Sequence, residues 1–262
     1  MEKGKIYDIQ LMEKFIKEIC RKAGKLTLAK FGKTGVKKTK VHQLDVVTQA
    51  DLASNKFLIS SIKKRYPKHG IISEETGNFQ EDSDYIWVID PLDGSLNFAR
   101  KIPIFVTQVA LLHKGRPELG AIYYSVTDAL YFAKRNGGAS LNGRRISCSS
   151  KKNLDHSVGA YVSKLNPYTV NLVKKLLKHE KNGLWFRAFA SCGFSSAAVA
   201  TGSVDWYISK DGFVWDYAPT SLILRESGCR VTDLKGNSLT VNSRNILAAN
   251  PSLHARILKL LQ

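Results

Sequence analysis

The chain has 262 residues, of which 44% are hydrophobic, so it is long enough to bury a substantial core. Its 40 Lys and Arg residues against 22 Asp and Glu give a formal charge of +18; this charge attracts phosphorylated metabolites, nucleic acid and acidic membranes alike, although scattered lysines favour a solvated surface. Zinc-like cysteine spacing, a secretory signal and a membrane-length apolar run are all missing, so we expect a cytoplasmic protein with reduced thiols and no membrane partner.

The first third of the chain shows two helical patterns. Apolar residues at three-to-four spacing predict an amphipathic helix over 9–31. The basic segment 33–43 has no apolar period and predicts an exposed loop. A second helix is predicted over 48–66, with Thr48 as its N-cap and Pro67 ending it.

Strand patterns follow, and acidic residues stand at the ends of the first two. Ile71–Ser73 predicts a short strand that ends at Glu74 and Glu75. Tyr85–Ile89 reads as a buried strand that runs into Asp90. Three further runs predict neighbouring antiparallel strands of one sheet: Phe105–Leu112, Leu119–Val126 and Ala129–Ala133.

After about residue 150 the pattern changes to alternating strands and helices, which is typical of α/β structure. The strands are predicted at Val158–Val162, Trp185–Phe189, Trp206–Ser209, Cys229–Thr232 and Ile246–Ala249. Because no repeat or long linker interrupts the chain, we expect one functional domain, 1–262, made of an α+β half (1–150) and an α/β half (151–262).

Carboxylates carry the strongest chemical signal. The segment Asp90-Pro91-Leu92-Asp93-Gly94 has the composition of a tight turn, and that explanation is sufficient for the pentapeptide alone. Two carboxylates at the exit of a buried strand, near Glu74, would however repel one another unless a cation neutralises them. Oxygen ligands favour magnesium, calcium or manganese.

Two further features bear on this hypothesis. Asp216 adds a third carboxylate, although by itself it reads as the cap of a helix that runs to Gly228 with Pro219 in the first turn. Gly94 and Ser95 begin another helix, whose free amides could receive a phosphate. Cations beside free amides suit phosphoryl transfer.

At this point the sequence resembles the inositol monophosphatases over nearly its whole length. The segments that carry the resemblance are WVIDPLDGSLNF (87–98), WDYAPTSLILRESG (215–228), LDVVTQAD (44–51), KFLISSIKKRYPKHGIISEET (56–76) and NILAAN (245–250). The resemblance implies a layered αβαβα sandwich, with an antiparallel sheet in the N-terminal half and an α/β C-terminal half, and a homodimer.

The resemblance also assigns the metal ligands. It implies two or three Mg²⁺ ions, with Mn²⁺ as a substitute, held by Glu74, Asp90, Asp93, Asp216 and the backbone oxygen of Leu92. These are the carboxylates that charge repulsion singles out.

The remaining catalytic roles follow by the same correspondence. Asp51 and Ser95 would orient and deprotonate the attacking water, with Ser95 in place of the family's threonine, and Glu74 would act beside them. The amides of Gly94 and Ser95 would bind the phosphate, and Glu75 would be an outer-shell residue.

Substrate contacts depart from the pattern. Ser209 stands where inositol-specific relatives have a glutamate that binds ring hydroxyls, and serine lacks that bidentate acceptor. Cys192 and Ser163 fall near other substrate contacts. Lys40 and His42 lie in the basic loop, which covers the metals in relatives, and we leave them outside the core site.

The sequence therefore predicts a lithium-sensitive, magnesium-dependent phosphomonoesterase, with inositol monophosphate as first candidate substrate. Fructose-1,6-bisphosphate, histidinol phosphate and 3'-phosphoadenosine-5'-phosphate are alternatives. A non-enzymatic alternative is a protein that binds RNA or a transcription complex, as some bacterial relatives are thought to do. The full carboxylate set favours the enzyme, and the chain has neither a Walker loop nor an HExxH motif.

Overall fold

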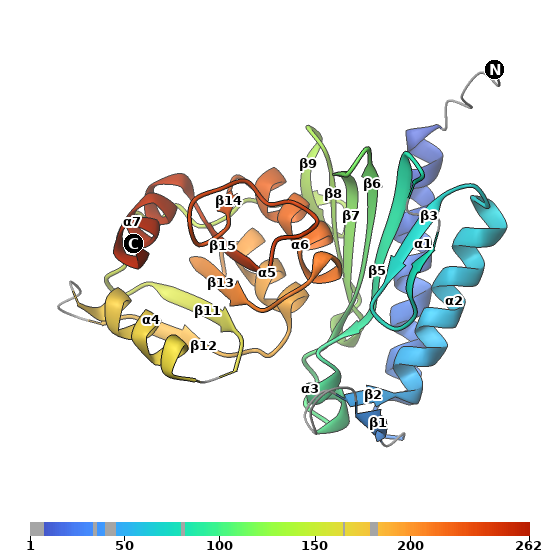
Figure 1. Ribbon diagram of the computed structural model, residues 1–262, viewed down its shortest axis with the longest axis horizontal. Helices are drawn as coiled ribbons and strands as arrows, with labels where there is room; N and C mark the ends of the chain where they lie inside the picture. The colour runs from blue at the N-terminus through green and yellow to red at the C-terminus, as the bar shows by residue number, and fades with distance from the viewer. Residues whose placement is uncertain (1–7, 34–35, 40–45, 80–81, 165, 179–182) are drawn as a thin grey trace.

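The computed structural model describes residues 8–33, 36–39, 46–79, 82–164, 166–178 and 183–262. Five layers follow one another across the molecule (Figure 1). An outer pair of helices, α1 (Ile9–Lys30) and α2 (Gln49–Arg65), covers an eight-stranded sheet. Helices α5 (Cys192–Ala200) and α6 (Val214–Glu226) lie between this sheet and a five-stranded one, which α4 (Pro167–Leu177) and α7 (Pro251–Leu261) cover. The expected αβαβα sandwich is confirmed.

The two N-terminal helices form where local sequence places them. The side chain of Asp8 caps α1 by accepting a 2.8 Å hydrogen bond from the backbone N–H of Gln10. Thr48 caps α2 as predicted, and its hydroxyl accepts from the N–H of Ala50 at 3.1 Å. The helix ends at Arg65, before Pro67, because proline disfavours helical backbone at the residue before it.

The loop prediction for the basic segment is wrong in part. Residues Val36–Thr39 form β1, which pairs antiparallel with β2 (Val46–Thr48). Main-chain hydrogen bonds to β2 define this strand, so it forms without an alternation of apolar and polar side chains. Lys40 and His42 lie outside the described residues.

The large sheet has the strand order β10-β9-β8-β7-β6-β5-β3-β4. Its pairs are antiparallel except β3 with β5, which run parallel. The predicted strands all form, although β7 starts at Arg116, before the expected Leu119. The bounds are β3 Gly70–Ser73, β4 Gly77–Phe79, β5 Tyr85–Asp93, β6 Val106–His113, β7 Arg116–Tyr124, β8 Ala129–Lys134, β9 Gly138–Leu141 and β10 Arg144–Arg145, with a short helix α3 at Ser95–Ala99 and a 3₁₀ turn at Ser125–Thr127.

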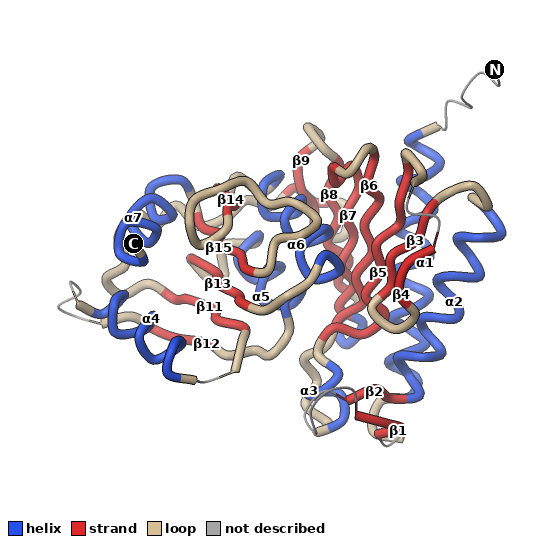
Figure 2. Tube along the Cα trace, in the orientation of Figure 1, coloured by secondary structure: helices blue, strands red, loops and turns tan. Residues whose placement is uncertain are grey.

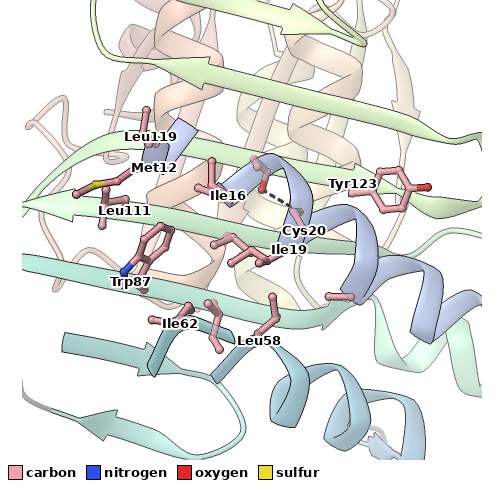
Figure 3. Close-up of a cluster of buried hydrophobic side chains, with 14 of the residues drawn as sticks. Met12, Ile16, Ile19, Cys20, Leu58, Ile62, Trp87, Leu111, Leu119 and Tyr123 are labelled. Atoms are coloured by element: carbon pink, nitrogen blue, oxygen red, sulfur yellow. Dashed lines mark hydrogen bonds between the residues drawn. The ribbon is translucent and has the colours of Figure 1, made fainter. Parts of the chain in front are cut away.

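The apolar face of α1 packs against this sheet and α2 (Figure 3). Met12, Ile16 and Ile19 stand at helical spacing and are buried, and Trp87 of β5 is fully enclosed beside them. Burial of each such side chain contributes roughly 1.5–3 kcal/mol. This core fixes β5, the strand that leads to the acidic motif, at the centre of the sheet.

The second sheet has the order β12-β11-β13-β15-β14 (Figure 2). Strand β11 runs parallel to β12 and β13, whereas β15 runs antiparallel to β13 and β14. Its strands are β11 Val158–Val162, β12 Trp185–Arg187, β13 Trp206–Lys210, β14 Arg230–Thr232 and β15 Asn245–Ala249. All five were predicted within two residues of these ends. Gly159 is required here, because a Cβ at this position would lie 1.9 Å from the Trp206 ring.

Helix α6 joins the layers, since it packs on strands β5 to β9 of the first sheet as well as on α5. Within the part of the chain that the structure describes, no helix is both long and apolar enough to cross a bilayer.

Candidate active site

The acidic motif forms a bulge at the end of β5. Asp90 lies opposite Gln108 and Asp93 opposite Val106, so the strand carries one residue more than its partner β6 between these pairs. Pro91, inside the bulge, has no N–H to give to the sheet. Gly94 follows with φ +95°, and a Cβ there would come within 2.8 Å of the Ile104 carbonyl. The residues Asp90 to Asp93 therefore form a strand bulge and not the tight turn that their composition suggested.

Glu74 and Asp90 lie beside each other because β3 and β5 are parallel. The N–H of Glu74 donates to the carbonyl of Ile89 at 3.3 Å, which brings the residue after β3 level with the end of β5. Burial raises the pKa of Asp90 well above its usual range, and the charges of Glu74, Asp93 and Asp216 raise it further. The structure therefore gathers all four predicted carboxylates.

Asp216 comes from the first turn of α6. Phe213 is the N-cap residue, and its N–H donates to Asp216 Oδ2 at 2.7 Å, so Asp216 supports the cap from the third helical position. Pro219 lies inside the helix and not in its first turn, because α6 starts at Val214 and its N-cap is Phe213, not Asp216 as expected. Burial, followed by the charges of Asp93 and Glu74, raises the pKa of Asp216 to about 7.

Asp93 is held by the start of α5, from the other half of the chain. Its Oδ2 accepts from Ser191 Oγ and from the N–H of Gly193, both at 2.6 Å, and its Oδ1 accepts from the N–H of Cys192 at 3.1 Å. A carboxylate suits this position because the amides at a helix N-terminus carry partial positive charge. Ser191 and Gly193 were not predicted as site residues, although Ser191 has the pattern of an N-cap before an apolar run.

The donor set fits a hard divalent cation. Ligand atoms of Asp93, Cys192 and Asp216 all lie within 4.8 Å of one another. Burial and the charges of Asp216 and Asp93 raise the pKa of the Cys192 thiol well above its usual range, so the sulfur stays neutral while the carboxylates supply the charge. Clustered carboxylate oxygens are the ligands that Mg²⁺ and Mn²⁺ prefer.

The predicted pair Asp51 and Ser95 is in contact. Ser95 Oγ lies 2.9 Å from Asp51 Oδ1 and 2.9 Å from the Leu92 carbonyl oxygen. The other carboxylate oxygen of Asp51 accepts from the N–H of Thr48 at 2.7 Å and from the Thr48 hydroxyl. Burial raises the pKa of Asp51, which makes it a better proton acceptor than a solvated aspartate.

Ser95 also begins α3, with Gly94 as N-cap. The first N–H groups of a helix have no partner within the helix itself. These amides follow the acidic bulge directly, as the sequence indicated.

The predicted substrate residues lie on the C-terminal half. Ser209 of β13 is only 1% exposed, and its Oγ accepts from the Tyr217 hydroxyl at 3.3 Å and lies 3.7 Å from Cys192 Sγ. Ser163 directly follows β11, next to the strand that carries Ser209, and is partly exposed. Tyr217 was not anticipated, because its contact with Ser209 depends on the shape of the turn between β13 and α6, where the N–H of Gly212 also donates to the Tyr217 hydroxyl.

Comparison with known proteins gives one consistent result. The model of the inositol monophosphatase family matches residues 8–262. The Nus factor SuhB of Escherichia coli K12 is 37% identical over 239 residues, which cover 88% of each chain. A protein of Thermotoga maritima named fructose-1,6-bisphosphatase/inositol-1-monophosphatase is 29% identical over 242 residues, or 92% of each chain.

A solved structure shares the fold. The extragenic suppressor protein SuhB of Bartonella henselae superposes with a TM-score of 0.90 at 28% identity, and the match covers 96% of this chain and 98% of that one. The similarity therefore extends over both halves and both sheets.

Proposed function

The chain belongs to the inositol monophosphatase family, and we propose that it hydrolyses a phosphomonoester at the cluster of Glu74, Asp90, Asp93 and Asp216. Family membership supports a phosphatase that binds metal. The observation that carries the proposal is the gathering of these carboxylates, from three separate parts of the chain, where burial and neighbouring carboxylate charges raise the pKa values of Asp90 and Asp216. A fold that needed only stability would gain by replacing them.

The cofactor in this proposal is Mg²⁺, as two or three ions, with Mn²⁺ as a substitute. Glu74, Asp90, Asp93, Asp216 and the backbone oxygen of Leu92 would hold it. When bound, the metal supplies positive charge that makes water more acidic and stabilises the charge of the phosphoryl group.

The chain's own groups then position the reactants. Asp51, fixed by Thr48 on one oxygen, faces Ser95 on the other, so the Ser95 hydroxyl and the Asp51 carboxylate form a relay that orients water and takes its proton. The first amides of α3, at Gly94 and Ser95, would bind the phosphate in line with that water. Glu74 would take part in catalysis together with Asp51 and Ser95, in addition to holding the metal.

The substrate is the finer part of the proposal. Inositol monophosphate is the first candidate, and fructose-1,6-bisphosphate, histidinol phosphate and 3'-phosphoadenosine-5'-phosphate are alternatives. Ser163, Cys192 and Ser209 would lie on the substrate side. Lithium sensitivity, homodimer formation and a cytoplasmic location belong to the same proposal and rest on the family resemblance.

A substrate panel with Mg²⁺, Mn²⁺ or chelator tests the proposal. We expect phosphate release that needs the metal and that Asp216→Asn abolishes, while Asp84→Asn, a matched change at an exposed aspartate, keeps normal turnover. Metal-dependent hydrolysis that survives in Asp216→Asn would contradict the site assignment. Absence of turnover on every phosphomonoester tried would contradict the enzyme.

A second function, binding of RNA or a transcription complex, is supported by the +18 charge and by the 37% identical relatives named Nus factors. Electrostatic binding of RNA weakens as salt concentration rises. We expect the affinity for RNA to fall steeply between about 50 and 200 mM salt and to be unchanged in Asp93→Asn. An affinity that does not respond to salt would argue against this function.

A further inference from the structure

Cys148 and Cys229 come from separate parts of the chain and lie together at the C-terminal end of α6. Cys148 lies in the segment that connects β10 to β11 and so links the two sheets. Cys229 follows the C-terminal end of α6. All four cysteines of the chain are free thiols.

The backbone holds both residues in place. The N–H of Cys148 donates to the carbonyl of Ser227, the last residue of the α6 cap, at 2.9 Å. Helix α6 ends in a Schellman motif, in which Gly228 donates to Arg225 at 3.0 Å and Cys229 donates to Leu224 at 2.9 Å. The contact between the two cysteines is therefore built from the helix end itself.

The sulfur of Cys148 lies beside Gly228, the residue that precedes Cys229. Cys148 Sγ lies 3.7 Å from where a Cβ of Gly228 would stand, and Gly228 has φ +97°. The interaction of the two thiols lowers the pKa of Cys148 and raises that of Cys229. Both side chains also belong to one apolar cluster.

Their surroundings differ in the way that a reactive pair requires. Cys148 is partly exposed, whereas Cys229 is 7% exposed. Redox-sensitive cysteines combine access to solvent, thiolate character and a neighbouring second thiol. The other two cysteines lack this combination: Cys20 is fully buried in the core, Cys192 lies in the carboxylate cluster, and burial raises the pKa of both.

We propose that Cys148 and Cys229 are a redox-active pair that a hydroperoxide converts into an intramolecular disulfide. Cys148 is the attacking residue and Cys229 the resolving one. The site is separate from the proposed phosphatase centre and does not depend on that function.

The chemistry balances with hydrogen peroxide as the oxidant. The Cys148 thiolate attacks one peroxide oxygen, the O–O bond breaks, and Cys148 becomes a sulfenic acid as hydroxide leaves. The Cys229 sulfur then attacks the Cys148 sulfur, the S–O bond breaks, and a second hydroxide leaves as the S–S bond forms. The two thiol protons convert the hydroxides to water, so two thiols lose two electrons and one peroxide becomes two waters.

The bond would tie the C-terminal end of α6 to the segment that joins the two sheets. Helix α6 carries Asp216 in its first turn, so the disulfide would fix the opposite end of a helix that contributes to the carboxylate cluster. Because a disulfide that closes a long loop restricts the unfolded chain, the oxidised protein should melt at a temperature about 5 °C or more above the reduced protein.

The test treats the full-length protein with hydrogen peroxide, unfolds it in denaturant so that iodoacetamide also blocks the buried Cys20 and Cys192, and maps the peptides by mass spectrometry. We expect a Cys148–Cys229 link, two alkylated cysteines where the reduced protein has four, a monomer band on a non-reducing denaturing gel, and full reversal by dithiothreitol. Cys20→Ser, the matched control, should still form the link, because serine can keep the hydrogen bond to the Thr107 carbonyl.

Three outcomes would overturn the proposal. One is a protein that keeps four reactive thiols after oxidation. Another is Cys148 oxidised to sulfinic acid, or linked to a second chain, without a bond to Cys229. The third is a rise in melting temperature that persists in the Cys148→Ser/Cys229→Ser double variant. The mapping uses the unmodified chain, so it does not depend on any variant folding.

Discussion

The carboxylate of Asp93, at the end of β5, accepts a 2.6 Å hydrogen bond from the backbone N–H of Gly193, at the start of α5. This bond joins the large sheet to the layer of helices between the sheets. It also places Asp93 at a helix N-terminus, whereas burial and the charges of neighbouring carboxylates raise the pKa of Asp90. In the metal-free protein, Asp93 therefore stabilises the fold, whereas the charge of Asp90 destabilises it.

Replacement of Asp93 by asparagine is expected to reduce both activity and stability. The amide group of asparagine would face the donors of Ser191 and Gly193, and the unfolding free energy of the metal-free protein should fall by about 1–2 kcal/mol. Turnover should fall roughly a hundredfold or more because a proposed metal ligand is weakened. Denaturant unfolding in chelator and phosphate release in Mg²⁺ measure the two effects, with Asp84→Asn as the control. Unchanged stability would contradict the role of Asp93 at α5.

Asp90→Asn should move the stability of the metal-free protein in the opposite direction. The pKa of Asp90 is raised by burial and by three neighbouring carboxylates, so its charge is unfavourable in the fold, and neutral asparagine relieves that repulsion by about 1 kcal/mol. Asparagine can still accept from the N–H of Leu92, as Asp90 Oδ1 does at 3.1 Å. We expect a higher melting temperature in chelator and a smaller rise on addition of Mg²⁺. A lower melting temperature in chelator would show that repulsion does not dominate at this position.

Ser95→Ala tests the pair with Asp51. Loss of the hydroxyl leaves Asp51 Oδ1 without its 2.9 Å partner, and kcat should fall about 10- to 100-fold with KM nearly unchanged. Ser95→Thr keeps a hydroxyl and should retain most of the activity. Steady-state kinetics on the preferred substrate gives kcat and KM for both variants. Equal losses in the alanine and threonine variants would remove the hydroxyl from the mechanism.

His69 should make the protein less stable on acidification. It is buried, its Nδ1 accepts from Trp87 Nε1 at 3.0 Å, and burial lowers its pKa to about 4. Because the unfolded chain binds a proton near pH 6.5 and the folded chain does so only near pH 4, this contribution is complete above pH 6.5 and is lost as pH falls toward 4. The slope is at most about 1.4 kcal/mol per pH unit.

His69→Gln provides the measurement. Glutamine can accept from Trp87 but does not titrate, so its unfolding free energy should change less between pH 7 and pH 5 than that of the unmodified protein. His254, whose pKa burial also lowers to about 4, remains in both proteins and leaves a residual slope. Identical slopes in the two proteins would exclude His69 as a source of the pH dependence.

Local patterns in the sequence predicted the two N-terminal helices and the long strands well. The three-to-four spacing of Met12, Ile16 and Ile19 reports one buried helix face, and the apolar run of β5 reports a strand covered on both sides. Such patterns depend only on neighbours within a few residues. Strand β1 was not predicted, because its pairing with β2 uses main-chain groups and its sequence shows no alternation of apolar residues.

For the same reason, the site residues were predicted better than the contacts that hold them in place. Residue type and spacing pointed to Asp90, Asp93 and Glu74, and the family resemblance added Asp51 and Ser95. The contacts that hold them were not visible: Ser191 and Gly193 bond to Asp93 across about a hundred residues of sequence. Tyr217 contacts Ser209 across the turn between β13 and α6, and the side-chain pattern does not reveal the shape of that turn.

The sequence by itself determined where the helices and strands form and which residues carry negative charge at the end of a buried strand, because backbone preferences and side-chain periodicity act over short distances. The tertiary structure decided that Asp216 joins Asp90, that α5 presents its amides to Asp93, and that Cys148 meets Cys229. Each of these contacts depends on how the layers pack, and that packing balances burial over the whole chain against the entropy of closing long loops.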